Sequence, residues 1–278
     1  MLTVPELTDQ LRRLGLSPRC GPVLVHAALR SLGPVEGGSA GVVTALSTAL
    51  RGALGPEGTL LAFTATPENS ETSRLDAAVT AGLSRAELLA YRRAMAPFDP
   101  ATTPSSPTMG RLSEELRTTP GALRSTHPQT SFAALGPRAA ELTADHRLDC
   151  HLGEYSPLGA LYRAGGSVLM LGASPERCTA LQLAEYRVPD APVKRYGCMV
   201  RDAAGRPAWV RFDGLDLDDQ YFPQMLAAIR PRLTGAREGR IGGAECLLMP
   251  VVQAVDAARW WHLRQRATVV ADPIRANR

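Results

Sequence analysis

The sequence predicts a single α/β domain with a mixed central β-sheet flanked by helices. Residues 22–63 indicate a strand, a glycine-rich loop, a helix and a second strand, a unit that usually holds parallel strands under a covering helix. Residues 167–172 (SVLMLG) give the strongest buried-strand signal and lead into a loop and a helix. Residues 198–212 indicate a hairpin. No repeat or linker divides the 278 residues, so we expect one domain over 1–278.

Composition and charge are typical of a soluble cytoplasmic protein. Hydrophobic residues make up 45% and charged residues 21%, which excludes a disordered or disulfide-scaffold chain. No apolar run approaches the roughly 18 residues that cross a bilayer, and the polar start is unlike a secretory signal. The 31 basic and 27 acidic residues are dispersed, which disfavours nucleic-acid binding. We expect neither a membrane nor a nucleic-acid partner, and both a monomer and a homodimer stay open.

Apolar periodicity places the elements in chain order. Residues 5–16 and 40–54 repeat apolar side chains every three to four positions, which predicts helices. The short apolar runs 22–27 and 59–63 predict strands, the second after the turn 55–58 (GPEG).

A long irregular segment separates the two halves of the chain. Residues 65–110 carry little apolar pattern except a short helix near 86–95, and loops of this length usually cover or shape a site. We therefore expect a site-covering loop at about 65–110. Beyond it, we expect strands at 131–135, 167–172 and 244–252, and helices over 112–116, 137–142, 153–164, 178–186 and 254–262.

The five cysteines predict no metal or disulfide site. They lie far apart and form no C-x-x-C pair. We expect most of them to be buried thiols, and we expect no bound metal.

The loop that follows the first strand is a candidate anion site. Residues 31–38 (SLGPVEGG) lead into a helix, whose free backbone N–H groups and dipole favour an anion, and glycines let a phosphate approach the backbone. The segment matches neither a P-loop nor G-x-G-x-x-G, so a plain strand-to-helix turn is an equal alternative.

Three histidines have positions that suit chemistry. His26 ends a predicted strand just before the glycine loop, where open α/β sheets bind ligands. His151 follows Asp149 closely, and a carboxylate beside an imidazole could form an oriented base. His127 lies in a polar turn. We expect His146 and His262 on the surface, and a structural role is the alternative for each of the three.

A polar face is expected on the helix after the most buried strand. Spacing of three to four residues puts Cys178, Gln182 and Glu185 on roughly one helical face at the edge of the sheet. The solvent side of an amphipathic helix explains the same spacing equally well.

A series of short segments in fixed order carries a family resemblance. They are 25–29 (VHAAL), 31–33 (SLG), 37–38 (GG), 55–60 (GPEGTL), 98–100 (FDP), 109–110 (MG), 124–128 (RSTHP), 131–134 (SFAA), 153–158 (GEYSPL), 168–172 (VLMLG) and 183–187 (LAEYR). Together they resemble the antibiotic N-acetyltransferase family, best known for aminoglycoside 3-N-acetyltransferases, over roughly residues 20–225.

The resemblance implies transfer of an acetyl group from acetyl-CoA, or another acyl-CoA, to an amine of an aminoglycoside, aminocyclitol or related product. It implies a fold other than the common acetyltransferase fold, and places His26 near the thioester. The residues implied to bind the cofactor are Ser31, Gly33, Val35, Gly37 and Gly38 in the loop, with Arg124, Ser125 and His127 lining the channel. Such chemistry needs an amine to lose its proton and donors to hold an oxyanion.

One position departs from the family pattern. Gln182 stands where family members carry a histidine, the implied general base of a Thr-x-x-His-x-x-Glu segment. A glutamine amide can orient or donate but cannot accept a proton at neutral pH. Cys178 likewise replaces an asparagine.

Three explanations stay open for Gln182. His151 backed by Asp149, or in second place His26, could replace the base. The chemistry could instead use an amine of low pKa or a covalent relay through Cys178 or Cys150. Alternatively, the chain binds ligands without turnover.

Carboxylates are needed to bind a cationic acceptor. The candidates are Glu185, at the family's acidic position, Asp149 and Glu154, with Glu68 and Glu71 in the long loop. The acidic run 213–219 fits a solvated turn better. The net charge of +4 favours a less cationic acceptor, and resistance and biosynthetic roles both stay open.

Overall fold

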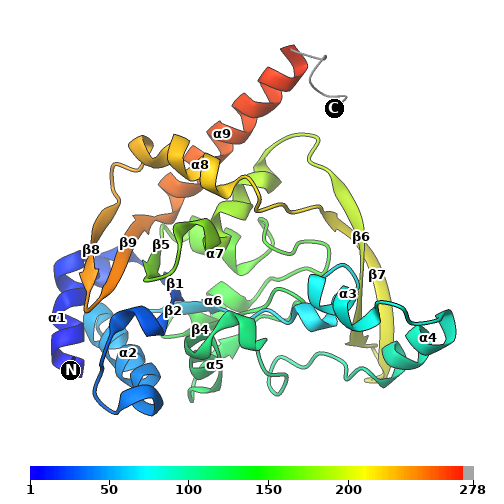
Figure 1. The fold of residues 1–278 in the computed structure, drawn as a ribbon, viewed down its shortest axis with the longest axis horizontal. Helices are drawn as coiled ribbons and strands as arrows, with labels where there is room; N and C mark the ends of the chain where they lie inside the picture. Colours follow the sequence, from blue (N-terminus) through cyan, green and yellow to red (C-terminus); the bar gives the residue numbers. More distant parts are fainter. Residues whose placement is uncertain (272–278) are drawn as a thin grey trace.

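The protein is built around one seven-stranded mixed sheet, seen in Figure 1. The computed structural model describes residues 1–271. Three neighbouring strands at the centre run parallel, namely β2 (Leu60–Phe63), β1 (Val23–Ala27) and β5 (Ser167–Leu171). The chain leaves β1 to form β2 on one side and later forms β5 on the other. This reversal makes the carboxyl end of β1 a topological switch point, where α/β sheets bind ligands.

Antiparallel strands extend the sheet on both sides, in the order β3-β4-β2-β1-β5-β9-β8. The outer strands are β4 (Phe132–Leu135), β3 (Leu123–Arg124), β9 (Ala244–Pro250) and β8 (Arg237–Ile241). The mixed α/β sheet predicted from the sequence is confirmed. We did not predict β8, because its sequence REGRI is charged and four of its five residues are exposed on the edge of the sheet.

Alternating side chains of the central strands build a core on each face of the sheet. In β5, Val168 and Met170 belong to one apolar cluster and Leu169 and Leu171 to the other. This is the period-two pattern of a strand covered on both faces. Each leucine buried in these clusters stabilises the fold by about 1.5–3 kcal/mol.

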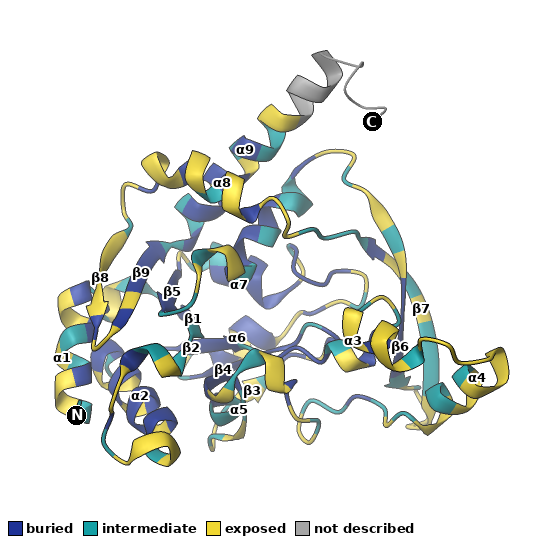
Figure 2. Ribbon diagram, in the orientation of Figure 1, coloured by how far each residue is buried: buried dark blue, intermediate teal, exposed yellow. Residues whose placement is uncertain are grey.

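Helices cover both faces, and Figure 2 shows the buried centre of the molecule. One face is covered by α1 (Val4–Leu14), α2 (Gly38–Leu54) and α5 (Arg111–Thr118). The other is covered by α6 (Ala139–Thr143), α7 (Pro157–Arg163), α8 (Phe222–Ile229) and α9 (Val251–Ala271). None of the helices within residues 1–271 is long and apolar enough to cross a membrane.

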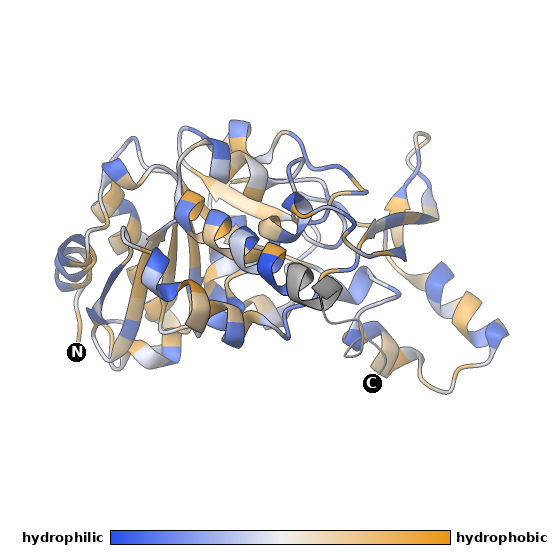
Figure 3. Cartoon of the chain, turned by 90° about the horizontal axis from the view of Figure 1, so that it is seen from above, coloured by the Kyte–Doolittle hydropathy of each residue, from blue (hydrophilic) through white to orange (hydrophobic). Residues whose placement is uncertain are grey.

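A two-stranded sheet and two helices form a lobe beside this body, as Figure 3 shows from above. Its strands are β6 (Val193–Arg201) and β7 (Pro207–Leu215), its helices α3 (Arg74–Thr80) and α4 (Arg85–Ala94). Asn69 fastens the segment before α3 to β6, because its side chain donates to Met199 O (2.8 Å) and accepts from Met199 N (2.7 Å). Residues 65–110 are predicted from the sequence to form a loop with one short helix. They contain a second helix as well, α3, whose side chains are mostly exposed.

Candidate active site

A cleft of about 410 Å³ opens at the carboxyl ends of β1 and β5. The residues after β5, at 172–174, form part of its wall, and the start of α5 faces them. The polar side chains that line it are His26, Thr108, Ser113, Ser174, Glu176, Arg177, Thr179, Gln182 and Asp219. The cleft thus lies at the switch point of the sheet and collects side chains from segments far apart in sequence.

His26 is the imidazole of the cleft. It is the penultimate residue of β1, and its Nε2 lies 3.2 Å from Thr179 Oγ1. Burial lowers the pKa of His26 to about 4, so the ring is neutral at physiological pH. A neutral ring nitrogen can accept a hydrogen bond from the Thr179 hydroxyl.

A 3-10 helix carries the polar row that faces the cleft. The segment Thr179–Arg187, labelled η6, has this conformation, whereas an α-helix is predicted from the sequence. With three residues per turn, Thr179, Gln182 and Glu185 lie directly one above another. The Gln182 side chain lines the cleft and forms no hydrogen bond to any residue of the described chain.

Cys178 does not share that row. It precedes the 3-10 helix, is completely buried in the apolar core, and has a pKa raised by burial to about 12. Burial also raises the pKa of Cys150, and neither thiol lines the cleft. Both are protonated at neutral pH, so a covalent relay through either cysteine is disfavoured.

Glu185 lies at the far end of the row, against acidic residues. Burial, together with the negative charges of Asp218, Asp216 and Asp219, raises its pKa to about 8, although a hydrogen bond to the backbone of Asp218 acts in the opposite direction. Glu185 Oε1 is buried without a hydrogen-bond partner in the described chain. The acidic run predicted as a solvated turn is thus partly buried beside Glu185, and Asp219 lines the cleft.

His151 and Asp149 do not form the predicted base pair. His151 Nε2 lies 2.7 Å from Gln129 Oε1, and its ring packs on Tyr196 with centroids 4.2 Å apart. Asp149 is exposed. Burial lowers the pKa of His151 to about 3, and His151 does not line the cleft. Although Asp149 and His151 are close in sequence, one side chain is exposed and the other is buried.

His151 belongs to a buried cluster with His127 and His146. The centroid of the His127 ring lies 4.6 Å from that of His151 and 4.8 Å from that of His146. The expectation that His146 lies on the surface is wrong, because it is 7% exposed and its Nδ1 lies 2.9 Å from Ser125 Oγ. His127 Nδ1 accepts from the backbone of Gln129, and its Nε2 lies 3.1 Å from Leu148 O. The side chains of Ser125 and His127 are thus hydrogen-bonded to other parts of the fold, and neither residue lines the cleft.

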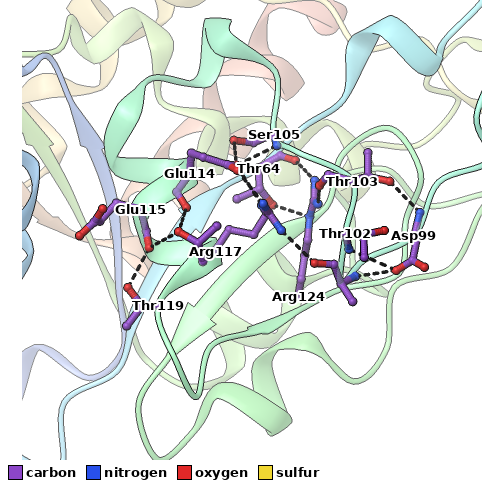
Figure 4. A network of polar contacts seen from close by, with 12 residues as sticks. Thr64, Asp99, Thr102, Thr103, Ser105, Glu114, Glu115, Arg117, Thr119 and Arg124 are labelled. Atoms are coloured by element: carbon purple, nitrogen blue, oxygen red, sulfur yellow. Dashed lines mark hydrogen bonds and ion pairs between the residues drawn. The ribbon is translucent and has the colours of Figure 1, made fainter.

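Arg124 is also engaged within the fold, as Figure 4 shows. Its Nη2 donates to Thr64 O (2.7 Å), its Nη1 donates to Thr103 O, and its Nε donates to Ser131 Oγ (2.9 Å). The guanidinium also lies 4.9 Å from the centroid of the Phe98 ring. Arg124 therefore fastens the end of the long 65–110 segment to the sheet.

The glycine loop presents open backbone beside the cleft. Gly33, Gly37 and Gly38 have φ values of 79°, 75° and 61°, in the left-handed region that favours glycine. All three are exposed, and a Cβ at Gly33 or Gly38 would meet no atom within 4 Å. The first turn of α2 is therefore accessible, as an anion site requires.

Other residues of the loop are held by the fold. Val35 is buried, and Leu2 pairs with it in a short bridge that ties the start of the chain to the loop. The Ser31 hydroxyl donates to Ala28 O at 2.6 Å. Ser31 also lines a second cavity of about 870 Å³ that shares the wall 172–174 with the cleft.

Comparison with known proteins decides the family. The model of the aminoglycoside 3-N-acetyltransferase family matches residues 24–262. An aminoglycoside N(3)-acetyltransferase III from a Salmonella species is 37% identical over 262 residues, covering 89% of this chain and 87% of the relative. The chain belongs to the aminoglycoside 3-N-acetyltransferase family. The resemblance stated from the sequence is confirmed.

Solved structures agree with this assignment. YokD from Bacillus subtilis matches with a TM-score of 0.87 and 30% identity, over 96% of this chain and 95% of that chain. An AAC-IIIb structure described as a binary complex with CoASH matches with a TM-score of 0.79 and 33% identity, over 95% and 97%. The fold predicted for a member of this family is confirmed.

This aminoglycoside 3-N-acetyltransferase family member builds its cleft partly from residues that we did not single out in the sequence. Thr179, Ser113 and Thr108 line it, together with Asp219 from the acidic run named in the sequence. Thr179 was within reach of sequence reasoning, since it opens the Thr-x-x-Gln-x-x-Glu segment. Ser113 lies on α5, where nothing in the local sequence marks it.

Among the carboxylates named from the sequence, Glu154 and Glu185 differ in environment. Glu154 accepts from Arg187 Nε at 2.5 Å and lies outside the cleft lining. Glu185 has no ion pair within the described chain and shares a helix face with Gln182. Glu185 does not line the cleft either, but it lies one 3-10 turn from Gln182, which does.

Proposed function

We propose that the protein transfers an acetyl group from acetyl-CoA to an amine of an aminoglycoside. The observation that carries this proposal is the family match over residues 24–262, which spans every residue that lines the cleft. The relatives named as aminoglycoside N(3)-acetyltransferases cover most of this chain. A neutral imidazole, a hydroxyl and an amide on the cleft wall suit proton transfer and oxyanion stabilisation.

The coenzyme is proposed to lie along the glycine loop with its thioester in the cleft. Gly37 and Gly38 expose the first turn of α2, a 17-residue helix whose dipole and free N–H groups attract phosphate. The relative with bound CoASH supports a CoA thioester as co-substrate. The cofactor channel is still predicted to involve Arg124, Ser125 and His127. They would act on it indirectly, by holding the shape of the adjoining loop.

The acceptor is proposed to be a cationic amine. Asp219 lines the cleft, and Asp216 and Asp218 lie close enough to interact with neutral Glu185, so the negative charge of three aspartates gathers at this end of a chain whose net charge is +4. A structure of AAC-VIa with bound sisomicin, 29% identical with a TM-score of 0.78 over 95% of this chain and 98% of that chain, supports an acceptor of this class.

A direct assay tests the function. Purified protein is mixed with acetyl-CoA and sisomicin, CoA thiol release is followed with a thiol reagent, and the acetylated product is identified by mass spectrometry. We expect one acetyl group added for each thiol released. Binding of CoA by calorimetry without thiol release, across several aminoglycosides, would contradict the proposed transfer and favour a binding protein.

A further inference from the structure

His26 and Thr179 form a hydrogen-bonded pair on the wall of the cleft. His26 Nε2 and Thr179 Oγ1 lie 3.2 Å apart, and both residues line the cavity together with Gln182. We propose that His26 is the general base of this enzyme and receives the amine proton through the Thr179 hydroxyl. The inference rests on the proposed acyl transfer, and it names the group that acts where Gln182 cannot.

Position excludes the other histidines from this role. Within the described part of the chain, His26 is the one histidine that lines the cleft. His127, His146 and His151 are at most 7% exposed, and their ring nitrogens bond to the carbonyls of Leu148 and His151 and to the side chain of Gln129. A base must lie within hydrogen-bond reach of the proton that it removes, directly or through one intervening group.

The pair can carry a balanced proton transfer. When Thr179 donates its hydrogen to His26 Nε2, its oxygen keeps lone pairs that can accept from an amine N–H. The reacting amine attacks in its uncharged form: its nitrogen bonds to the thioester carbonyl carbon while one N–H proton passes to the Thr179 oxygen and the threonine proton passes to Nε2. The C–S bond then breaks, and the proton returns by the same path to the thiolate sulfur. The products are the amide and CoA thiol, and His26 is neutral again.

The surroundings keep the imidazole ready to accept a proton. Burial lowers the pKa of His26 to about 4, so the ring is neutral at physiological pH. Its ring is a weak base, but an amine that has bonded to the thioester carbon becomes a much stronger acid. The charged groups that face the same cleft are Glu176, Arg177 and Asp219.

Gln182 is assigned a positioning role beside this pair. Its side chain lies one 3-10 turn from Thr179 on the same face, and its amide is free of hydrogen bonds to the described chain. An amide can both donate and accept, so it can orient the acceptor amine or donate to the thioester oxygen without taking a proton.

Two substitutions test the relay, with acetyl-CoA and sisomicin as probes. His26→Gln and Thr179→Val should each lower kcat by about two to four orders of magnitude, the usual effect of losing a general base. The double variant should lose little more than either single variant, because residues that act as a unit are strongly non-additive. Activity of His26→Gln within about threefold of the wild type would overturn the proposal, since a base contributes far more than that.

A third substitution gives a readout that a structural role for His26 would not move. Gln182→His adds an imidazole with an ordinary pKa near 6.5, so its kcat should fall below about pH 6.5 where the wild type stays flat. In the Gln182→His background, His26→Gln should lower kcat by about tenfold or less, because a second base is present. Equal losses for His26→Gln in both backgrounds would overturn the assignment.

Controls separate failure of this proposal from failure of the proposed function. Glu141→Gln changes an exposed carboxylate outside the cleft lining and should leave kcat unchanged. Calorimetry should show that His26→Gln still binds CoA within about threefold, as expected if the proton path alone is lost. If the wild type transfers no acetyl group, the proposed function is wrong. If the wild type is active and the His26 and Thr179 variants are equally active, the proposed function stands and the base assignment is wrong.

Discussion

At the scale of single residues, the site depends on burial changing the charge of ordinary groups. His26 is held neutral and Glu185 is held protonated because neither charged form is solvated in its surroundings. The sequence identified both positions but could not supply these protonation states. It placed Asp149 with His151 on adjacency alone, and the structure turns the two side chains in different directions.

Glu185 should make the stability of the protein depend on pH. Its folded-state pKa of about 8 is raised from 4.5, so the folded state keeps a proton that the unfolded state loses, and the free energy of unfolding falls as pH rises between these values. Glu185→Gln removes this pH-dependent fall in the free energy of unfolding, because glutamine carries no titratable proton. The advantage of the variant over the wild type should be small at pH 5 and grow by about 1.4 kcal/mol per pH unit towards pH 8 in urea unfolding.

A matched exposed carboxylate serves as the control for that measurement. Glu141 is exposed and hydrogen-bonds Arg138 at 2.7 Å, which lowers its pKa. Glu141→Gln should not show a gain that grows towards pH 8. If the difference between Glu185→Gln and the wild type stays constant from pH 5 to pH 8, Glu185 is ionised in the folded protein and the neutral assignment is wrong.

At the scale of elements, local signals predicted most of the helices and strands but not their exact form. The central strands and α2 follow apolar patterns and lie where we expect them. The segment Thr179–Arg187 is a 3-10 helix, and its tighter winding brings Thr179 into one row with Gln182 and Glu185. The sequence favours an α-helix here because 3-10 runs of more than three or four residues are uncommon.

Arg124 should hold the long segment against the sheet. Arg124→Ala leaves Thr64 O, Thr103 O and Ser131 Oγ without their donor, which should cost about 2–4 kcal/mol in urea unfolding. Limited proteolysis should also cut residues 99–105 faster, since that stretch loses its anchor.

An exposed arginine provides the comparison for this variant. Arg138 pairs with Glu141 on the surface, so Arg138→Ala should change the free energy of unfolding by no more than about 1 kcal/mol. Equal effects for Arg124→Ala and Arg138→Ala would show that the buried network contributes nothing beyond an ordinary surface pair.

At the scale of the whole molecule, the cleft joins segments that lie far apart in the chain. β1, the start of α5, the loop after β5 and the acidic run before α8 all contribute to it. A coenzyme that bridges the glycine loop and this cleft binds the folded state alone, so it should stabilise the protein as a unit. The free energy of unfolding should rise by about 2.7 kcal/mol at a CoA concentration of 100 Kd.

The phosphates of CoA can be tested separately in the same measurement. Pantetheine has the thiol arm without the phosphates, so it should stabilise less than CoA at equal concentration if α2 receives the pyrophosphate. Equal stabilisation by both would contradict the placement along the glycine loop. Absence of any stabilisation by CoA would contradict the proposed coenzyme.

The sequence by itself determined the family, the sheet core and the position of the glycine loop, because ordered motifs, apolar periodicity and turn residues are local signals. Only the tertiary structure decided which polar groups meet. It placed Thr179 next to His26, which is 153 positions away in sequence, and it placed the acidic run beside Glu185. It also buried His127, His146 and His151, for which the sequence predicted a surface position or a role in chemistry. Such pairings depend on how strands and helices pack, and burial then sets the charge of each group.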